Sequence, residues 1–323
     1  METTLPPLSD LHLHLDGSLS PALFTKLVRK EGIRSAFGMD LSGDFDAAAL
    51  LSVAEDCTSL SDYLTRFDLP LLVMQSEENL ALCVEDLLRR LSEQNVVYSE
   101  IRFAPQLHTQ KGMSQEMAVR AALEGLARGT ARYGVRSALI LCCMRGEDTL
   151  QANLKTIRLT EKYLGQGVVA ADLAGAESIF PNELYAPAFE LARSLSVPFT
   201  IHAGEAAGPG SIRSALQMGA VRIGHGIRAM EDPALLDELR ERQIPLEVCP
   251  TSNVQTRAVA SYEDHPVLKL LRLGLMVTVN TDNMTVSHIT LAEEFEKLRT
   301  LLGMTDEEEL QLRKNSLSAM FTQ

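Results

Sequence analysis

The sequence predicts an α/β protein that folds as a single (β/α)8 barrel, or TIM barrel, with a helical insertion after the first strand. Two observations predict this fold. Short apolar runs rich in β-branched residues alternate with stretches of helical spacing. There are eight such runs, the strand number of this barrel, and the later ones recur at the spacing of one strand, one helix and two loops. A doubly wound open sheet is the alternative.

Each predicted strand is an apolar run that ends at a polar or glycine-containing corner. The runs are Leu8–His14, Val96–Phe103, Arg136–Cys143, Val168–Leu173, Pro198–His202, Val221–His225, Pro245–Val248 and Leu275–Asn280.

Helical signals fill the long stretch between the first two strands. Ser20 suits a helix N-cap and Pro21 the first helical position. We expect residues of about 18–94 to form inserted helices over the barrel mouth, where substrate pockets usually lie. Near the end of the chain, Thr305 and Glu308 have capping-box spacing and lead into a closing helix, Leu310–Phe321. No linker divides the chain, so residues 1–323 are expected to form one domain.

Composition indicates which kinds of partner and which cell compartment to expect. The net charge of −13 disfavours nucleic acid and anionic membranes and favours a neutral small molecule. Five cysteines without a C-x-x-C pair fit neither a disulfide framework nor a zinc ribbon, which predicts a reducing compartment. No apolar run is long enough to span a bilayer and no signal peptide is recognisable. A cytoplasmic location is expected.

Four segments place metal-binding or titratable side chains at the ends of predicted strands. They are His12–Gly17, His202–Glu205, Gly224–Gly226 and Asn280–Asn283. His12 and His14 are two residues apart, so both project from the same face of a strand. His202 ends the fifth strand and Asp282 follows the eighth, and a barrel brings these strand ends together. Three imidazoles and one carboxylate suit one Zn²⁺ with an open position, with iron, cobalt and manganese as alternatives. Taken singly, each histidine could also be a hydrogen-bonded core residue.

These residues lie in segments that resemble the adenosine deaminase family of the metal-dependent amidohydrolase superfamily. The similar segments are Asp10-Leu-His-Leu-His-Leu-Asp-Gly17, Asp172-Leu-Ala-Gly175, Ile201-His-Ala-Gly-Glu-Ala-Ala-Gly-Pro209, Arg222-Ile-Gly-His-Gly226, Pro250-Thr-Ser-Asn-Val-Gln-Thr256 and Val279-Asn-Thr-Asp282. They span nearly the whole chain in the family's order.

The resemblance implies hydrolytic deamination of adenosine, and of 2′-deoxyadenosine, to inosine and ammonia, an activity of purine salvage. It implies that zinc, held by the four residues above, activates water for attack on C6 of the purine. His225 and Asp282 would orient the attacking water, and protonated Glu205 would deliver a proton to N1. The alternative for Glu205 is a helix cap at the entry to the next helix.

The resemblance also assigns substrate contacts. His14 lies among them, Asp16 would accept a hydrogen bond from the ribose 5′-hydroxyl, and the backbone N–H of Gly175 would donate to purine N3. For Asp16 the alternative is an ordinary Asp-Gly turn. At position 283 the chain has Asn283 where the commoner family pattern has a second aspartate, and the amide is expected to donate to N7. The alternatives are weaker binding of the transition state or a different substrate.

Other functions remain as alternatives. Deaminases of free adenine, of adenosine monophosphate or of a modified adenine nucleoside could use the same barrel. Asp16 argues against the monophosphate, because a carboxylate near the 5′ position repels phosphate. A relative that binds without catalysis is a further alternative, although every ligand and both acid–base residues are present. The H-x-E and P-C-x-x-C motifs of zinc deaminases that act on nucleic acid are absent from the sequence.

Overall fold

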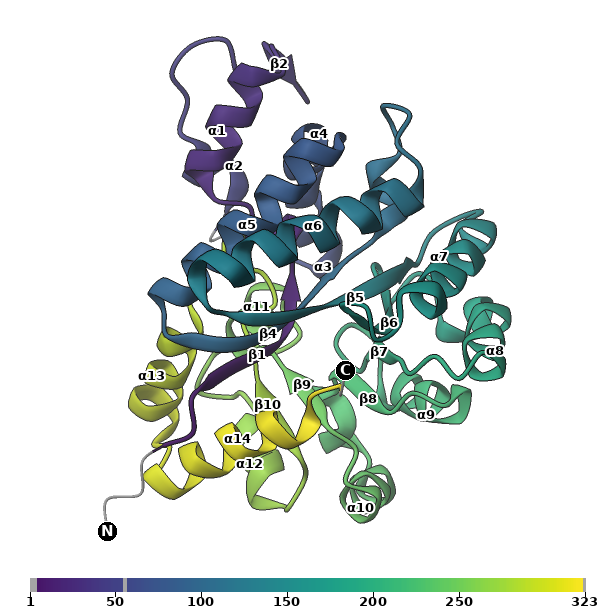
Figure 1. Ribbon diagram of the computed structural model, residues 1–323. Helices are drawn as coiled ribbons and strands as arrows, with labels where there is room; N and C mark the ends of the chain where they lie inside the picture. Colours follow the sequence, from purple (N-terminus) through teal and green to yellow (C-terminus); the bar gives the residue numbers. More distant parts are fainter. Residues whose placement is uncertain (1–4, 55–56, 322–323) are drawn as a thin grey trace.

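The computed structural model describes residues 5–54 and 57–321, and its core is a parallel β-barrel (Figure 1). One four-stranded sheet has the order β1-β4-β5-β6 and another the order β10-β9-β8-β7. The strands are β1 (Leu8–His14), β4 (Val96–Phe103), β5 (Arg136–Met144), β6 (Val168–Ala174), β7 (Thr200–Ala203), β8 (Arg222–His225), β9 (Leu246–Val248) and β10 (Val277–Val279).

Two seams join the sheets into a closed barrel. A parallel bridge pairs Leu13 with Asp282, and another pairs Ala171 with Phe199. At the first seam, the N–H of His14 donates to the Asp282 carbonyl at 2.7 Å and the N–H of Asp282 donates to the His12 carbonyl at 2.8 Å. The eight barrel strands in the described residues correspond to the eight runs expected from the sequence, although the bounds of several differ. The open-sheet alternative is wrong, because both sheet edges are paired.

Helices surround the strands (Figure 1). Those outside the insertion are α6 (Gln115–Tyr133), α7 (Leu150–Tyr163), α8 (Ala186–Ser194), α9 (Pro209–Met218), α10 (Pro233–Arg242), α11 (Pro250–Gln255), α12 (Val267–Arg272), α13 (Leu291–Leu302) and α14 (Asp306–Ala319). The expected capping box of Thr305 and Glu308 is confirmed, but α14 already begins at Asp306, since this cap fixes the first turn directly after Thr305.

The stretch between β1 and β4 is mainly helical, as expected. It contains α1 (Pro21–Lys30), a small hairpin of β2 (Ser35–Ala36) and β3 (Met39–Asp40), α2 (Ala47–Leu51), α3 (Leu60–Leu64), α4 (Asp68–Val73) and α5 (Glu77–Glu93). Ser20 caps α1 by accepting from the N–H of Leu23, and Pro21 is its first residue. The helix α5 lies against α6 and β4, in the position of a barrel helix (Figure 1), whereas α3 and α4 reach the mouth.

A network of buried charges fills the barrel interior below the mouth. The Arg102 guanidinium donates to Asp172 at 3.1 Å and to Glu247 at 2.8 Å. Arg222 pairs with the same Glu247 at 2.7 Å and with Glu100 at 2.6 Å. All five side chains are almost completely buried. Such charges are tolerated because each is paired, and their pairing fixes the strands relative to one another.

The cysteines, Cys57, Cys83, Cys142, Cys143 and Cys249, are unpaired and buried. None of the helices in the described residues is long and apolar enough to cross a membrane.

Candidate active site

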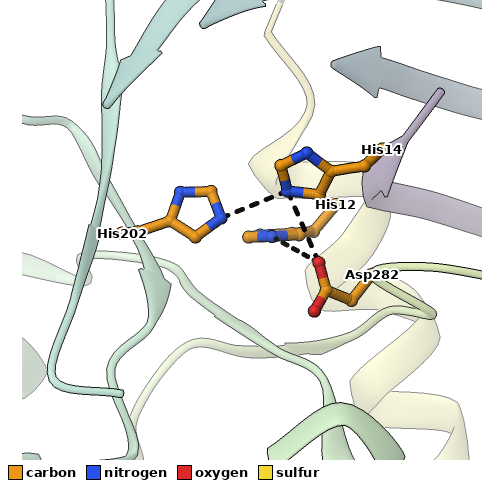
Figure 2. A group of neighbouring side chains, drawn as sticks. All are labelled: His12, His14, His202 and Asp282. Carbon is orange, nitrogen blue, oxygen red and sulfur yellow. Dashed lines mark hydrogen bonds and ion pairs between the residues drawn. The ribbon is translucent and has the colours of Figure 1, made fainter. Parts of the chain in front are cut away.

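Three histidines and one aspartate meet at the carboxyl ends of the barrel strands (Figure 2). His12 and His14 come from β1, His202 from β7, and Asp282 follows β10. The Nε2 atoms of His12 and His14 each lie 3.4 Å from Asp282 Oδ1, and His14 Nε2 lies 3.2 Å from His202 Nε2. The ligand atoms of the four residues all lie within 4.8 Å of one another, as donors to one metal ion would.

Two carboxylates below the cluster orient its histidines. His12 Nδ1 lies 2.8 Å from Glu247 Oε2, and His202 Nδ1 lies 3.0 Å from Asp172 Oδ2. A carboxylate accepts, so each Nδ1 carries the proton and each Nε2 turns a lone pair toward the centre. His12 Nε2 is buried and has no hydrogen-bond partner among the described residues. Residues with these free lone pairs fit a resident metal ion.

A second group of possible ligands shares two members with the first. It consists of His12, His225, Cys249 and Asp282. Burial, reinforced by the charge of Asp282, raises the pKa of the Cys249 thiol well above its usual value, which disfavours the thiolate that metals bind. Cys249 is also fully buried and does not line the cavity, whereas His14, His202 and Asp282 do. The first group is therefore the better candidate.

The backbone is strained at two of these positions. His225 and Asp282 both have φ of 60°, in the left-handed region that residues other than glycine rarely adopt. His225 ends β8 and Asp282 follows β10, and both side chains line the cavity at the mouth. Such strain is typical of functional sites, where the surrounding structure holds it in place.

Glu205 lies beside this cluster and is 4% exposed. Its Oε1 accepts from the Thr256 hydroxyl at 3.0 Å and from the Asn253 amide at 3.4 Å, and its Oε2 lies 3.5 Å from His225 Nε2. Burial, together with the charge of Asp282, raises the pKa of Glu205 to about 8, so the carboxyl holds a proton at neutral pH. The capping alternative is wrong, because Gly208 is the N-cap of α9 and no side chain caps it.

The loop that carries Glu205 is fixed by another carboxylate, Glu177. Its two oxygens accept from the backbone N–H groups of residues 204 to 207, at 2.7 to 3.1 Å. Four donors to one buried carboxylate leave this loop little freedom. Glu177 therefore sets where the Glu205 side chain starts.

A cavity of about 310 Å³ opens above the cluster. Its lining contains every candidate site residue from the sequence except His12, which lies fully buried beneath: His14, Asp16, Gly175, His202, Glu205, His225, Asp282 and Asn283. The α3–α4 segment adds an apolar wall that includes Leu60, Leu64 and Phe67. An apolar cavity with a few convergent polar groups is typical of a small-molecule site.

The residues expected to contact the substrate are closely packed. Gly175 has φ of 108°, and a Cβ there would meet Arg145 Cβ at 3.3 Å, so a side chain would be strained and crowded. Asn283 packs against Gly17, where an added Cβ would lie 1.8 Å from Asn283 Oδ1. Asp16 is 6% exposed, and burial raises its pKa to about 6.

Sequence reasoning missed the supporting side chains. Asp172 and Glu247 each interrupt an apolar strand, and an acid in a buried parallel strand is a readable signal of a buried partner. Ser252 donates to Asp282 Oδ2 at 2.6 Å. Ser252 and Asn253 both lie in the 250–256 segment that resembles the family, but the sequence pattern indicates no role for them. Glu177 carried no comparable signal.

Comparison with known proteins identifies the family of this chain. The profile of the adenosine deaminase family matches residues 7–323. The chain belongs to the adenosine deaminase family. An adenosine deaminase of Haemophilus ducreyi is 48% identical over 316 residues, which cover 97% of this chain and 91% of that protein. An adenosine deaminase of Enterococcus faecalis is 42% identical, covering 98% of this chain and 92% of the relative.

Solved structures support the same fold. The crystal structure of an adenine deaminase from Arthrobacter aurescens superposes with a TM-score of 0.88 at 29% identity, covering 98% of this chain and 94% of that chain. Adenosine deaminases are metal-dependent hydrolases, and the cluster of three histidines and one aspartate is a possible metal site in this chain.

Proposed function

We propose that this protein deaminates adenosine and 2′-deoxyadenosine to inosine and ammonia, with one Zn²⁺ held by His12, His14, His202 and Asp282. The observation that carries the proposal is a cavity in which this cluster of three histidines and one aspartate lies beside Glu205, whose pKa burial raises to about 8. When bound, zinc supplies Lewis-acid activation of water at neutral pH. Three imidazole nitrogens and one carboxylate oxygen suit zinc, with iron, cobalt and manganese as the alternative ions.

Glu205 is assigned as the proton donor to purine N1. Its Oε1 is occupied by the Thr256 and Asn253 donors, so the proton belongs on Oε2, which faces His225 and the cavity. Protonation of N1 makes C6 more electrophilic, and the carboxylate that remains can take back one of the two protons that the attacking water loses, while the other leaves with ammonia.

His225 and Asp282 are assigned to the attacking water. Burial lowers the pKa of His225 well below its usual value, so the ring is neutral. Burial alone would raise the pKa of Asp282, but the neighbouring histidines, His12 first, hold the pKa well below its usual range. A neutral imidazole and a carboxylate at the cavity floor can orient a water molecule and stabilise charge on its oxygen.

Substrate recognition is assigned to His14, Asp16, Gly175 and Asn283. Asp16 would accept from the 5′-hydroxyl, the Gly175 N–H would donate to N3, and the Asn283 amide would donate to N7. A carboxylate about 4 Å from a phosphate charge costs several kcal/mol at an intermediate dielectric, so the nucleoside is preferred to its monophosphate.

Free adenine, or a modified adenine nucleoside, is the second candidate substrate. The adenine deaminase of Arthrobacter aurescens has the same fold. The relatives named adenosine deaminase share more of the sequence with this chain, at 48% and 42% identity against 29%, which favours adenosine.

The test is the loss of adenosine absorbance with purified protein, beside 2′-deoxyadenosine, adenine and adenosine monophosphate, with metal measured in the same sample. We expect the nucleosides to be deaminated fastest and one zinc per chain. Faster turnover of adenine would move the assignment to the free base. Stoichiometric binding of nucleoside without turnover would indicate a non-catalytic relative.

We also propose that residues 1–323 form one hydrolase domain, with residues of about 18–94 inserted between the first two barrel strands. A role in purine salvage in the cytoplasm fits the five unpaired, buried cysteines, which are typical of a reducing compartment.

A further inference from the structure

A row of buried groups lies behind His225, on the side away from the cavity. The backbone N–H of Val267 lies 3.2 Å from His265 Nδ1, and His265 Nε2 lies 3.3 Å from Asn253 Oδ1. Asn253 Nδ2 in turn lies 2.9 Å from His225 Nδ1. The three side chains are at most 2% exposed, so water does not compete for these contacts.

The direction of each hydrogen bond follows from the first. A backbone N–H can only donate, so His265 Nδ1 accepts and carries no proton. Burial lowers the pKa of His265 to about 3, so the ring is neutral and its single proton is on Nε2. That N–H donates to Asn253 Oδ1, which fixes which end of the amide is which.

The amide nitrogen of Asn253 therefore faces His225. An amide NH₂ only donates, so His225 Nδ1 must accept, and the proton of the neutral His225 ring lies on Nε2. Nε2 is the nitrogen on the side of Glu205, at 3.5 Å from its Oε2. The same amide nitrogen lies 3.4 Å from Glu205 Oε1, so one side chain orients both groups.

We propose that Asn253 and His265 are positioning residues that hold His225 as its Nε2–H tautomer, so that His225 donates a hydrogen bond to the attacking oxygen and does not take a proton from it. This inference rests on the proposed function for its meaning. Removal of a proton by His225 would require a proton-free Nε2, and therefore a proton on Nδ1. There it would point at the Asn253 amide, a second donor.

The helix α11 is the element that makes this possible. In its few residues Ser252 donates to Asp282 and Asn253 donates to His225, and Thr256 directly after it donates to Glu205. Each of these three contacts gives a donor to a group that faces the cavity. Each acceptor is therefore held from the side of α11, and the side of each group that faces the cavity stays free for the reaction.

The test is the protonation of the His225 ring in the metal-loaded protein. Long-range ¹H–¹⁵N spectra of protein labelled at histidine distinguish a protonated ring nitrogen from a proton-free one, and His225→Gln identifies the signals that belong to this ring. We expect a proton-free Nδ1 and a protonated Nε2. The opposite pattern in the parent protein would overturn the proposal, and this measurement requires no substitution at Asn253 or His265.

Asn253→Asp reverses the bond with nearly the same shape, because a carboxylate accepts and does not donate. We expect His225 to carry its proton on Nδ1 in this variant, and kcat to fall at least about tenfold with KM changed by less than about twofold. An unchanged His225 spectrum would show that Asn253 does not set the tautomer. In His265→Phe, both His225 tautomers should be seen, since the amide is free to turn over; a spectrum identical to the parent would exclude His265.

Gln255→Glu is the matched control, since it makes the same amide-to-carboxylate change on α11. Its side-chain nitrogen donates to the Ser287 carbonyl and does not face His225. We expect the parent's His225 spectrum in this control, and a switched tautomer there would mean that added charge alone is responsible. The spectra report the tautomer even if the preferred substrate is a different purine, so failure of the proposed function is separable from failure of this inference.

Discussion

Replacing Glu247 with glutamine is expected to destabilise the fold by about 3 to 5 kcal/mol, the usual cost of removing one partner from a buried charge pair. Glu247 is fully buried and accepts from three groups: Arg102 at 2.8 Å, Arg222 at 2.7 Å and His12 Nδ1 at 2.8 Å. Glutamine keeps the shape but loses the charge and turns an NH₂ toward these donors. Two buried guanidinium groups would then lose a shared counter-ion.

The loss should be nearly independent of pH in the neutral range. Burial alone would raise the pKa of Glu247, but Arg102, Arg222 and the His12 hydrogen bond outweigh it and hold the pKa well below its usual value. A depressed pKa contributes stability that is present above the unfolded-state pKa and is lost only as pH falls through the folded-state pKa. The difference between parent and variant should therefore be the same at about pH 6 and about pH 8.

The assay is urea denaturation of the metal-loaded proteins, with Asp237→Asn as the control. Asp237 forms an ion pair with Arg240 at 2.6 Å in which both side chains are exposed, so the same carboxylate-to-amide change should cost no more than about 1 kcal/mol. If Glu247→Gln costs no more than this control, the buried network does not hold the barrel strands as argued.

Three further predictions concern activity. Removal of metal with a tight chelator should abolish deamination and lower the melting temperature, and added zinc should restore both; full activity in metal-free protein would exclude the proposed site. Glu205→Gln should keep metal and fold but lose roughly 10²- to 10⁴-fold in turnover, and because burial raises the Glu205 pKa to about 8, the parent's kcat/KM should fall as pH rises through that value; a flat alkaline profile would contradict the donor role. Asn283→Ala should lower kcat/KM for adenosine by an amount equivalent to about 1 to 3 kcal/mol of transition-state binding, and should change kcat/KM for 7-deazaadenosine little. Equal losses with both substrates would show that Asn283 does not bind N7.

Much of the barrel could be predicted because its strands are bounded by local signals. β1 and β4 have the predicted bounds, since each is an apolar run between clear breaks. From β7 onward the strands are shorter than expected, whereas β5 and β6 each extend one residue further. At β7 the strand begins at Thr200, because Pro198 has no N–H to donate and Phe199 forms only an isolated bridge. Strand ends depend on which neighbour supplies the hydrogen bond, and this is a property of the closed barrel.

In the candidate site, the sequence predicted the residues that face the cavity or the metal position, but not the side chains that support them. His12 and His14 share a strand face by spacing alone, and strand order brought His202 and Asp282 to them. The partners of these residues lie elsewhere in the sequence: Glu247 is 235 positions from His12, and Asp172 is 30 positions from His202. Which acid meets which histidine depends on register and on side-chain direction across the barrel, and neither follows from local pattern.

The candidate metal site lies across one of the two seams that close the barrel. His12 and His14 belong to the half formed by β1, β4, β5 and β6, whereas His202 and Asp282 belong to the half formed by β7 to β10. Asp282 is itself the bridging residue of one seam. An ion held by all four residues would link the two halves of the barrel, so the same four ligands would serve both the reaction and the closure of the barrel. Opening that seam by local unfolding would dismantle the reaction centre before either half lost its own sheet.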